Sequence, residues 1–373
     1  MKRAVPFLAC LLLPWTLLAQ GNHFTAATTQ EVPIVAQANV PSGNDDGSSV
    51  EPATRIDVAA NQDLNTSQQP NAKPNSSSTP RGESTPKIPG SMVGYIDNPI
   101  PESEVRIRFD AGFHDNAPDR AEFFYAQCGC NGGDAPGPKP GLVADLNFQQ
   151  LYLRAEYAPI SRFSIFTEVP VRWIQPQVFV AGTGTFPNQA GLSDVLAGFK
   201  FAAVASSSQY LTFQFQASFP SGDASKGLGT NHYSVEPELL YYQRISDRVA
   251  LEAMVGDTHP IGGSTALVHG VTTSFAGDVF SYGVGPSYAL YKGERVQFVP
   301  VIELVGWSVL SGLRTDPASI SIVKAGGSNI INLKGGARTF IGAHNSIYIG
   351  YGHQIAHDVW YKEILRVEYR YTF

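Results

Sequence analysis

From residue 103 to the C-terminus, apolar and polar side chains alternate along the chain with a period of two. The last seven residues, VEYRYTF, show this most clearly, because every second one is apolar or aromatic. A period of two is typical of β-strands with one apolar face, since successive side chains of a strand point to opposite sides. The pattern therefore predicts an all-β domain.

Twelve segments repeat this alternation, and turn residues separate them. They are residues 103–113, 143–157, 161–174, 192–205, 209–220, 233–244, 248–258, 278–291, 295–309, 328–341, 345–356 and 361–373. Short connections such as PIS, SSS and KGE alternate with long ones, such as those around 114–142 and 259–277. Tight turns at one end and long loops at the other are typical of outer-membrane β-barrels, in which an even strand number places both chain ends on the turn side.

A soluble β-sandwich would show a similar alternation, with its apolar face in the core and its charges outside. The predicted strands of 11 to 15 residues are long for a sandwich and suit a tilted membrane crossing. Aromatic residues near strand ends, including Tyr157, Trp173 and Trp307, fit girdles at the two membrane interfaces. We therefore predict a closed transmembrane antiparallel β-barrel of about 12 strands over residues 101–373.

The first hundred residues differ in composition from the rest. Lys2 and Arg3 precede an apolar run that is too short to span a bilayer and ends near Ala19, so residues 1–19 are predicted to be a secretory signal peptide. Residues 20–100 are rich in Asn, Ser, Thr, Gln and Pro, which predicts a disordered linker in the periplasm. The linker is either a plain spacer or a segment that binds a periplasmic or cell-wall partner.

The C-terminal segment resembles the last strand of bacterial outer-membrane proteins, which the barrel-assembly machinery recognises. Val367, Tyr369, Tyr371 and Phe373 occupy the alternate positions of that assembly signal. The resemblance implies insertion into outer-membrane lipid with the help of that machinery. A last strand that pairs with the first leaves no unpaired edge in lipid.

A second resemblance covers most of residues 190–373. The stretch GLSDVLAGFKF and the Gly-rich segment that begins ASFPSGD are similar to a family of outer-membrane proteins named for the MetA pathway of phenol degradation. Pro300, Glu303 and Gly306 match a Pro-x-x-Glu-x-x-Gly strand of that family, whereas Ser193 replaces its usual Gly. The resemblance implies passage of small solutes, including aromatic or hydrophobic ones, across the outer membrane.

Charged side chains on the polar face of the predicted strands are the candidate lining of the lumen. They are Arg106, Arg108, Glu168, Arg172, Lys200, Glu236, Glu238, Glu303, Lys334, Arg338, Arg366, Glu368 and Arg370. A barrel of twelve strands is intermediate between filled and open barrels. These charges therefore either bind one another in a closed core or line a narrow polar pore, and pairing is expected in both cases.

Catalysis, metals and cofactors find little support in the sequence. His232, His259, His269, His353 and His357 lie in or near long loops, but no Gly-x-Ser-x-Gly motif accompanies them. Cys128 and Cys130 are one residue apart, which is closer than the usual spacing of metal ligands. We therefore predict no catalytic residues, no metal site and no cofactor.

The formal net charge of −6 also argues against nucleic acid as a partner. The predicted function is that of an outer-membrane channel for small solutes. Two alternatives remain: a structural or partner-binding barrel with a closed lumen, and a barrel enzyme that modifies lipids.

Overall fold

The computed structural model describes residues 92, 94–120, 125, 136–268 and 270–373, all within one compact unit, Thr79–Phe373. The predicted signal peptide, residues 20–91 of the predicted linker, and Cys128 and Cys130 lie outside the described residues. Among the described residues, no helix has the length and apolar character needed to cross a membrane.

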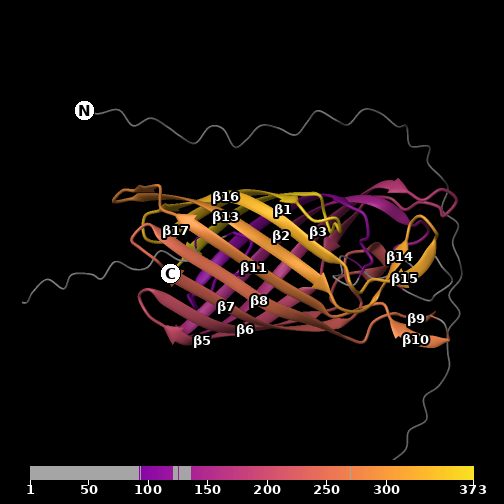
Figure 1. Ribbon diagram of the computed structural model, residues 1–373, viewed down its shortest axis with the longest axis horizontal. Coiled ribbons are helices and arrows are strands. Elements are labelled where there is room, and N and C mark those ends of the chain that lie inside the picture. The colour runs from indigo at the N-terminus through magenta and orange to yellow at the C-terminus, as the bar shows by residue number, and fades with distance from the viewer. Residues whose placement is uncertain (1–91, 93, 121–124, 126–135, 269) are drawn as a thin grey trace, which may run out of the picture. The chain divides into compact units, whose positions relative to one another are not determined.

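Twelve long strands form the barrel (Figure 1). They are β1 (Glu104–Asp115), β2 (Val143–Ile160), β3 (Phe163–Phe179), β5 (Val195–Ala205), β6 (Gln209–Phe219), β7 (Tyr233–Arg244), β8 (Val249–Ile261), β11 (Val279–Tyr288), β13 (Val296–Val309), β16 (Asn329–Ile341), β17 (Asn345–Gln354) and β18 (Glu363–Thr372). Each overlaps one of the twelve segments that the alternation predicts. The prediction of a twelve-strand antiparallel barrel is confirmed.

The strands pair in the order β11, β8, β7, β6, β5, β3, β2, β1, β18, β17, β16, β13, and a further pairing of β11 with β13 closes the ring. The chain returns to its start through β18, which pairs antiparallel with β1 from Glu104↔Thr372 to Phe113↔Glu363. Closure satisfies the backbone hydrogen bonds of every barrel strand, as a spanning sheet in lipid requires.

Short strands extend the wall or form hairpins in the loops. β4 (Gln189–Leu192) pairs with β3, and β12 (Tyr291–Lys292) pairs with β13. The hairpins β9 (Thr265–Val268) with β10 (Val271–Ser274) and β14 (Leu313–Asp316) with β15 (Ser321–Lys324) lie at the end of the barrel opposite the C-terminus (Figure 1). A short 3-10 helix, η1 (Ala224–Lys226), lies in the connection from β6 to β7. We call the hairpin end the loop end and the other the turn end.

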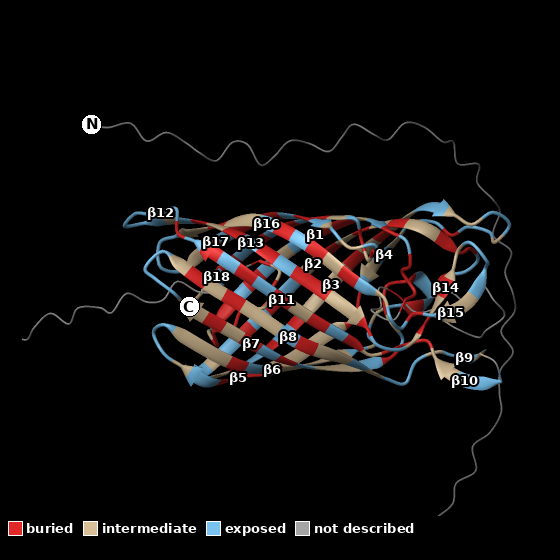
Figure 2. Cartoon of the chain, in the orientation of Figure 1, coloured by how far each residue is buried: buried red, intermediate tan, exposed pale blue. Residues whose placement is uncertain are grey.

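The two faces of each strand differ in burial and in chemistry. In β18, Arg366, Glu368 and Arg370 are buried, whereas Val367 and Tyr369 are 47% and 39% exposed. Buried and exposed residues alternate along neighbouring strands across the wall (Figure 2). The apolar face is outside and the charged face is inside, the reverse of a soluble protein and the arrangement of a barrel in lipid.

Residues 92 and 94–102 lie inside the barrel, and we call them the plug. Met92, Ile96 and Ile100 are only 4–8% exposed, and Met92 and Ile96 share an apolar cluster with the lumen-facing side chains of Val299 and Val301. The inward residues of β11 are small, and a Cβ at Gly283 would lie 3.1 Å from Ile96 Cγ1. The wall is therefore shaped to accept the plug.

The plug moves the predicted boundary of the linker. The predicted disordered segment extends to residue 100, but Met92 and residues 94–100 have defined contacts inside the barrel. Because the predicted linker is mostly polar, its composition does not single out Met92, Ile96 and Ile100, which lie at every fourth position. These bury enough apolar surface to hold the segment only because the barrel supplies the other half of the contact.

Candidate functional site in the barrel lumen

The structure brings all thirteen predicted lumen residues to the interior of the barrel. Eleven are buried, and Arg108 and Glu236 are partly buried and line the cavity described below. Their placement follows from strand geometry, because each alternates with an outward apolar residue. Their contacts divide them into an ion-pair network and a set that holds the plug.

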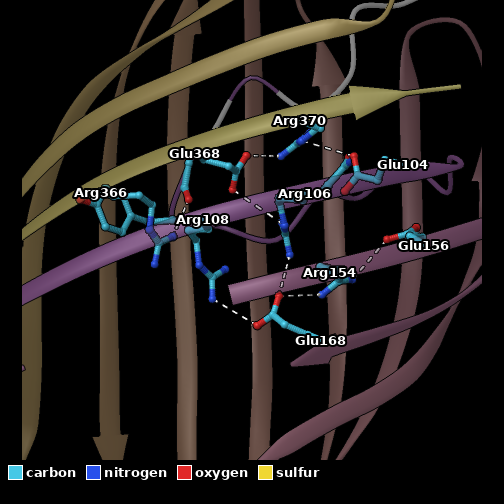
Figure 3. Close-up of polar contacts among 12 residues, drawn as sticks. Glu104, Arg106, Arg108, Arg154, Glu156, Glu168, Arg366, Glu368 and Arg370 are labelled. Atoms are coloured by element: carbon cyan, nitrogen blue, oxygen red, sulfur yellow. Dashed lines mark hydrogen bonds and ion pairs between the residues drawn. The ribbon is translucent and has the colours of Figure 1, made fainter. Parts of the chain in front are cut away.

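The ion-pair network lies on the wall formed by β1, β2, β3 and β18 (Figure 3). Glu168 receives two arginines, with Arg106 Nη2 at 3.3 Å and Arg108 Nη2 at 3.2 Å, and Arg154 Nη1 lies 4.0 Å away. Glu156 accepts from Lys200 Nζ of β5 at 2.9 Å and from Arg154 Nη2 at 3.2 Å. Since each carboxylate here faces several cations, no single pair accounts for the arrangement.

A second carboxylate extends the network across the closing seam between β1 and β18. Glu368 accepts from Arg338 Nη2 at 2.9 Å and from Arg370 Nη2 at 3.0 Å, and Arg106 Nε lies 3.9 Å away. Arg370 Nε lies 3.3 Å from Glu104 on β1 (Figure 3). Removing one member of such a buried network would leave an uncompensated charge, which typically costs about 3–5 kcal/mol.

Glu303 on β13 holds the plug by its backbone. Its carboxylate accepts from the N–H of Gly94 at 3.2 Å and from the N–H groups of Tyr95 and Ile96 at 2.9 Å each. Tyr348 Oη donates to the same carboxylate at 3.2 Å. A carboxylate that accepts several N–H groups makes strong, charge-assisted hydrogen bonds.

Two arginines bind carbonyl groups of the plug. Arg366 donates to the Gly94 carbonyl at 2.5 Å while its other nitrogens donate to Asp110 at 2.6 and 2.7 Å. Arg338 Nε donates to the Met92 carbonyl at 3.4 Å. Glu252, which was not among the predicted site residues, accepts from the Met92 N–H at 2.9 Å.

Lys334 on β16 contacts the plug through aromatic rings. Its ammonium donates to Tyr361 Oη at 3.0 Å and lies 4.1 Å from the ring centre of Tyr95 in the plug. It also lies 5.0 Å from the ring centre of Trp307 on β13. Cation–π attraction therefore links the plug to two strands of the barrel.

A cavity of about 340 Å³ lies in the lumen between the plug and the loop end. One wall carries Arg108, Arg154 and Arg172, and another carries Glu236 with Asp97 of the plug. Trp307 and Trp360 supply aromatic surface to the same cavity. A cavity of this size, with a few polar groups and aromatic walls, is typical of sites for small molecules.

The predicted loop histidines are dispersed. His232 lines the cavity, and burial lowers the pKa of its imidazole, which favours the neutral form at pH 7. His259 and His353 are exposed and lie 2.5 Å from Asp278 and 4.0 Å from Glu363. His357 lies in a separate loop pocket, and His269 lies outside the described residues. In the part of the chain that the structure describes, no three His, Cys, Asp or Glu residues form a metal-binding group.

Sequence reasoning missed the plug and the loop-end side chains that complete the cavity. Asp194 follows the predicted start of a strand at 192 and accepts from the N–H groups of Gly222 and Thr230 at 2.9 and 2.7 Å. Trp360 precedes β18 and packs edge-on against Trp307, with ring centres 5.0 Å apart. Neither has a periodic signal, because both lie where regular strands end.

Comparison with known proteins gives one family match. Residues 148–260 match the family model described as "Putative MetA-pathway of phenol degradation". The matched region runs from β2 to β8 and includes GLSDVLAGFKF, whereas Pro300, Glu303 and Gly306 lie outside it. No protein of curated function matches the chain.

Solved structures of outer-membrane barrels are similar in fold. The COG4313 outer membrane channel from Pseudomonas putida F1 is 13% identical, with 73% of this chain and 96% of that chain covered and a TM-score of 0.45. The NanC porin is 7% identical, with 73% and 100% covered and a TM-score of 0.39. LpxR from Salmonella typhimurium is 10% identical, with 73% and 100% covered and a TM-score of 0.39. The chain is thus a twelve-strand β-barrel of the outer-membrane type that resembles, over residues 148–260, the MetA-pathway phenol-degradation family.

Proposed function

We propose that this barrel is an outer-membrane channel through which small solutes, including aromatic or hydrophobic ones, pass when the plug is displaced. Solutes would enter the loop-end cavity, whose aromatic and charged walls suit molecules with a ring and a polar group. The N-terminal extension would lie in the periplasm, on the side of the turn end.

The observation that carries this proposal is the way the plug is held. Among the described residues, the barrel holds the plug by hydrogen bonds from its side chains, which include those of Glu303, Glu252, Arg366, Arg338 and Gln214. The strand pairings that close the barrel run from one barrel strand to the next. Displacing the plug therefore breaks no strand pairing, so the wall can stay closed while the lumen opens.

A closed structural barrel is the second candidate, and the same lumen favours it. The ion-pair network and the plug lie in the lumen on the turn-end side of the cavity. A plug that never leaves would therefore make the barrel impermeable. In that case the long loops and their hairpins would carry the function through binding to a partner. Recognition of the last strand by the barrel-assembly machinery and binding of a partner by the linker are proposals as well.

Solute flux separates the two candidates. The full chain and a variant lacking residues 92–102 would be reconstituted in liposomes, and swelling would be measured in phenol, benzoate and glucose. We expect slow flux for the full chain and faster flux for the deletion variant. A variant lacking the β9–β10 hairpin tips, residues 267–272, serves as a matched control. An absence of flux through both the full chain and the plug-deleted barrel would reject the channel.

A further inference from the structure

We propose that the loop-end cavity selects small organic ammonium ions that carry an aromatic ring. This rests on the proposed function, since it names the class of solute that the cavity would admit. It follows from the balance of charges around the cavity, which differs between its two walls.

Each guanidinium of the basic wall already has partners, although the Nε atoms of Arg108 and Arg154 make no hydrogen bond among the described residues. Arg108 and Arg154 both face Glu168, and their guanidinium groups stack on Tyr152 and Phe166 at 3.8 and 3.7 Å from the ring centres. Arg172 donates to the amide oxygen of Gln150 at 2.8 and 2.9 Å when that amide is turned to satisfy both groups. An anion entering the cavity would compete with these contacts.

The acidic wall has carboxylates that form no direct ion pair. Gln216 donates to Glu236 at 2.7 Å, and the amide of Gln214 donates to Asp97 at 2.8 Å and also to Glu238. None of the ion pairs among the described residues includes Asp97, Glu236 or Glu238. Arg154, Arg106 and Lys200 act on Asp97 from beyond ion-pair distance, whereas the charges that act most strongly on Glu236 are those of Asp97 and Asp257. Amide hydrogen bonds supply no positive charge, so Glu236 is the carboxylate of this wall that attracts a cation.

A buried polar atom beside these carboxylates also lacks a partner. The side-chain oxygen of Gln214 has no hydrogen bond within the described structure, and the residue has no exposed surface. Its amide group lies between Asp97 and Glu238. An ammonium ion carries several N–H groups and could donate to Asp97 and Glu236 together, since both line the cavity.

The aromatic wall would contact the ring of the ligand. The indole N–H of Trp360 is buried and has no hydrogen-bond partner in the described part of the chain. The faces of Trp307 and Trp360 attract both an aromatic ring and a cation. A bare metal ion would use neither ring, whereas an aromatic amine uses the carboxylates and the rings at once.

Asp97 belongs to the plug, so the ligand would bind a residue of the segment that closes the lumen. A solute ammonium that forms an ion pair with Asp97 would compete with Gln214 for the carboxylate. Binding and plug position are then coupled, because any ligand that favours one plug position shifts the population towards it.

Three probes of similar size and different charge test the selection. Isothermal titration calorimetry of the purified full chain at pH 7 would use 2-phenylethylamine, 2-phenylethanol and 3-phenylpropanoate at matched ionic strength. We expect the amine to bind at least about tenfold more tightly than the alcohol, equal to about 1.4 kcal/mol, and the carboxylate to bind most weakly.

Variants test which carboxylates produce the preference for the amine. Glu236→Gln, on the barrel wall, and Asp97→Asn, on the plug, should each reduce the preference for the amine by about fivefold or more, and Asp247→Asn, in an exposed turn, should not. Equal affinity for the three probes, stronger binding of the carboxylate, or an unchanged preference in Glu236→Gln would overturn the proposal. Flux of phenol in liposomes together with equal binding of the three probes in calorimetry would contradict this inference alone. A preference in calorimetry without flux in liposomes would contradict the channel.

Discussion

At the scale of single residues, some of the charges predicted to line the lumen bind the plug. Glu303 and Arg366 are among the predicted lumen residues, and in the structure they bind an N–H group and a carbonyl group of the plug backbone, respectively. One carboxylate receives three N–H groups because successive amides of the plug point towards β13. Substitutions of these residues should therefore change permeation by changing how firmly the plug is held.

Glu303→Gln should loosen the plug and raise channel conductance. The neutral amide weakens the charge-assisted bonds to Gly94, Tyr95 and Ile96, each typically about 1.5–3 kcal/mol. Single-channel recording in planar bilayers measures the change, and Glu294→Gln, in an exposed turn, is the matched control. Conductance identical to that of the wild type would count against a removable plug.

Gly94 should tolerate no larger residue. A Cβ at this position would lie 2.1 Å from Cζ of the Tyr348 ring, whereas a Cβ at Gly335 meets nothing within 4 Å. Gly94→Ala should therefore raise conductance and expose the plug to protease, and Gly335→Ala should do neither. Limited proteolysis in detergent provides the readout, and protection of the Gly94→Ala plug equal to wild type would refute this prediction.

At the scale of the strands, the outward faces are matched to lipid. Ile302 is 60% exposed at the middle of β13, and Leu267 is 73% exposed in the β9 hairpin of the loops. Ile302→Lys should cost about 2–4 kcal/mol of folding free energy in a bilayer, because it places a charge near the membrane midplane. Leu267→Lys should have almost no effect. Urea unfolding in liposomes compares the two, and equal stabilities would place β13 outside the membrane.

The last strand has both a structural and a proposed recognition role. Phe373 donates its N–H to the Ser103 carbonyl at 2.9 Å, so its backbone helps to close the barrel and its ring points outside at 64% exposure. Phe373→Ala removes the ring and keeps that hydrogen bond. We expect less barrel in the outer membrane of cells but normal refolding of the purified chain in detergent. A defect in refolding as large as that in cells would indicate lost stability and no recognition signal.

At the scale of the whole barrel, closure and plugging are separate properties. The ring of strands is complete without the plug, since β11 pairs with β13 and β18 pairs with β1. The barrel lacking residues 92–102 should therefore still migrate anomalously in detergent gels when unboiled, as the full chain should. Loss of that behaviour in the deletion variant alone would show that the plug is needed for a closed wall.

The amino-acid sequence by itself determined the barrel, because every strand carries a local two-residue signal that also assigns each side chain to lipid or lumen. Arg366, Glu368 and Arg370 are recognisable as interior residues from VEYRYTF alone. Only the tertiary structure decided which interior charges meet. Glu303 faces Gly94, Tyr95 and Ile96 across more than 200 residues of sequence, and Asp97 reaches a cavity wall built from β7. Contacts of that range depend on strand order and on a segment without periodicity, so no local pattern encodes them.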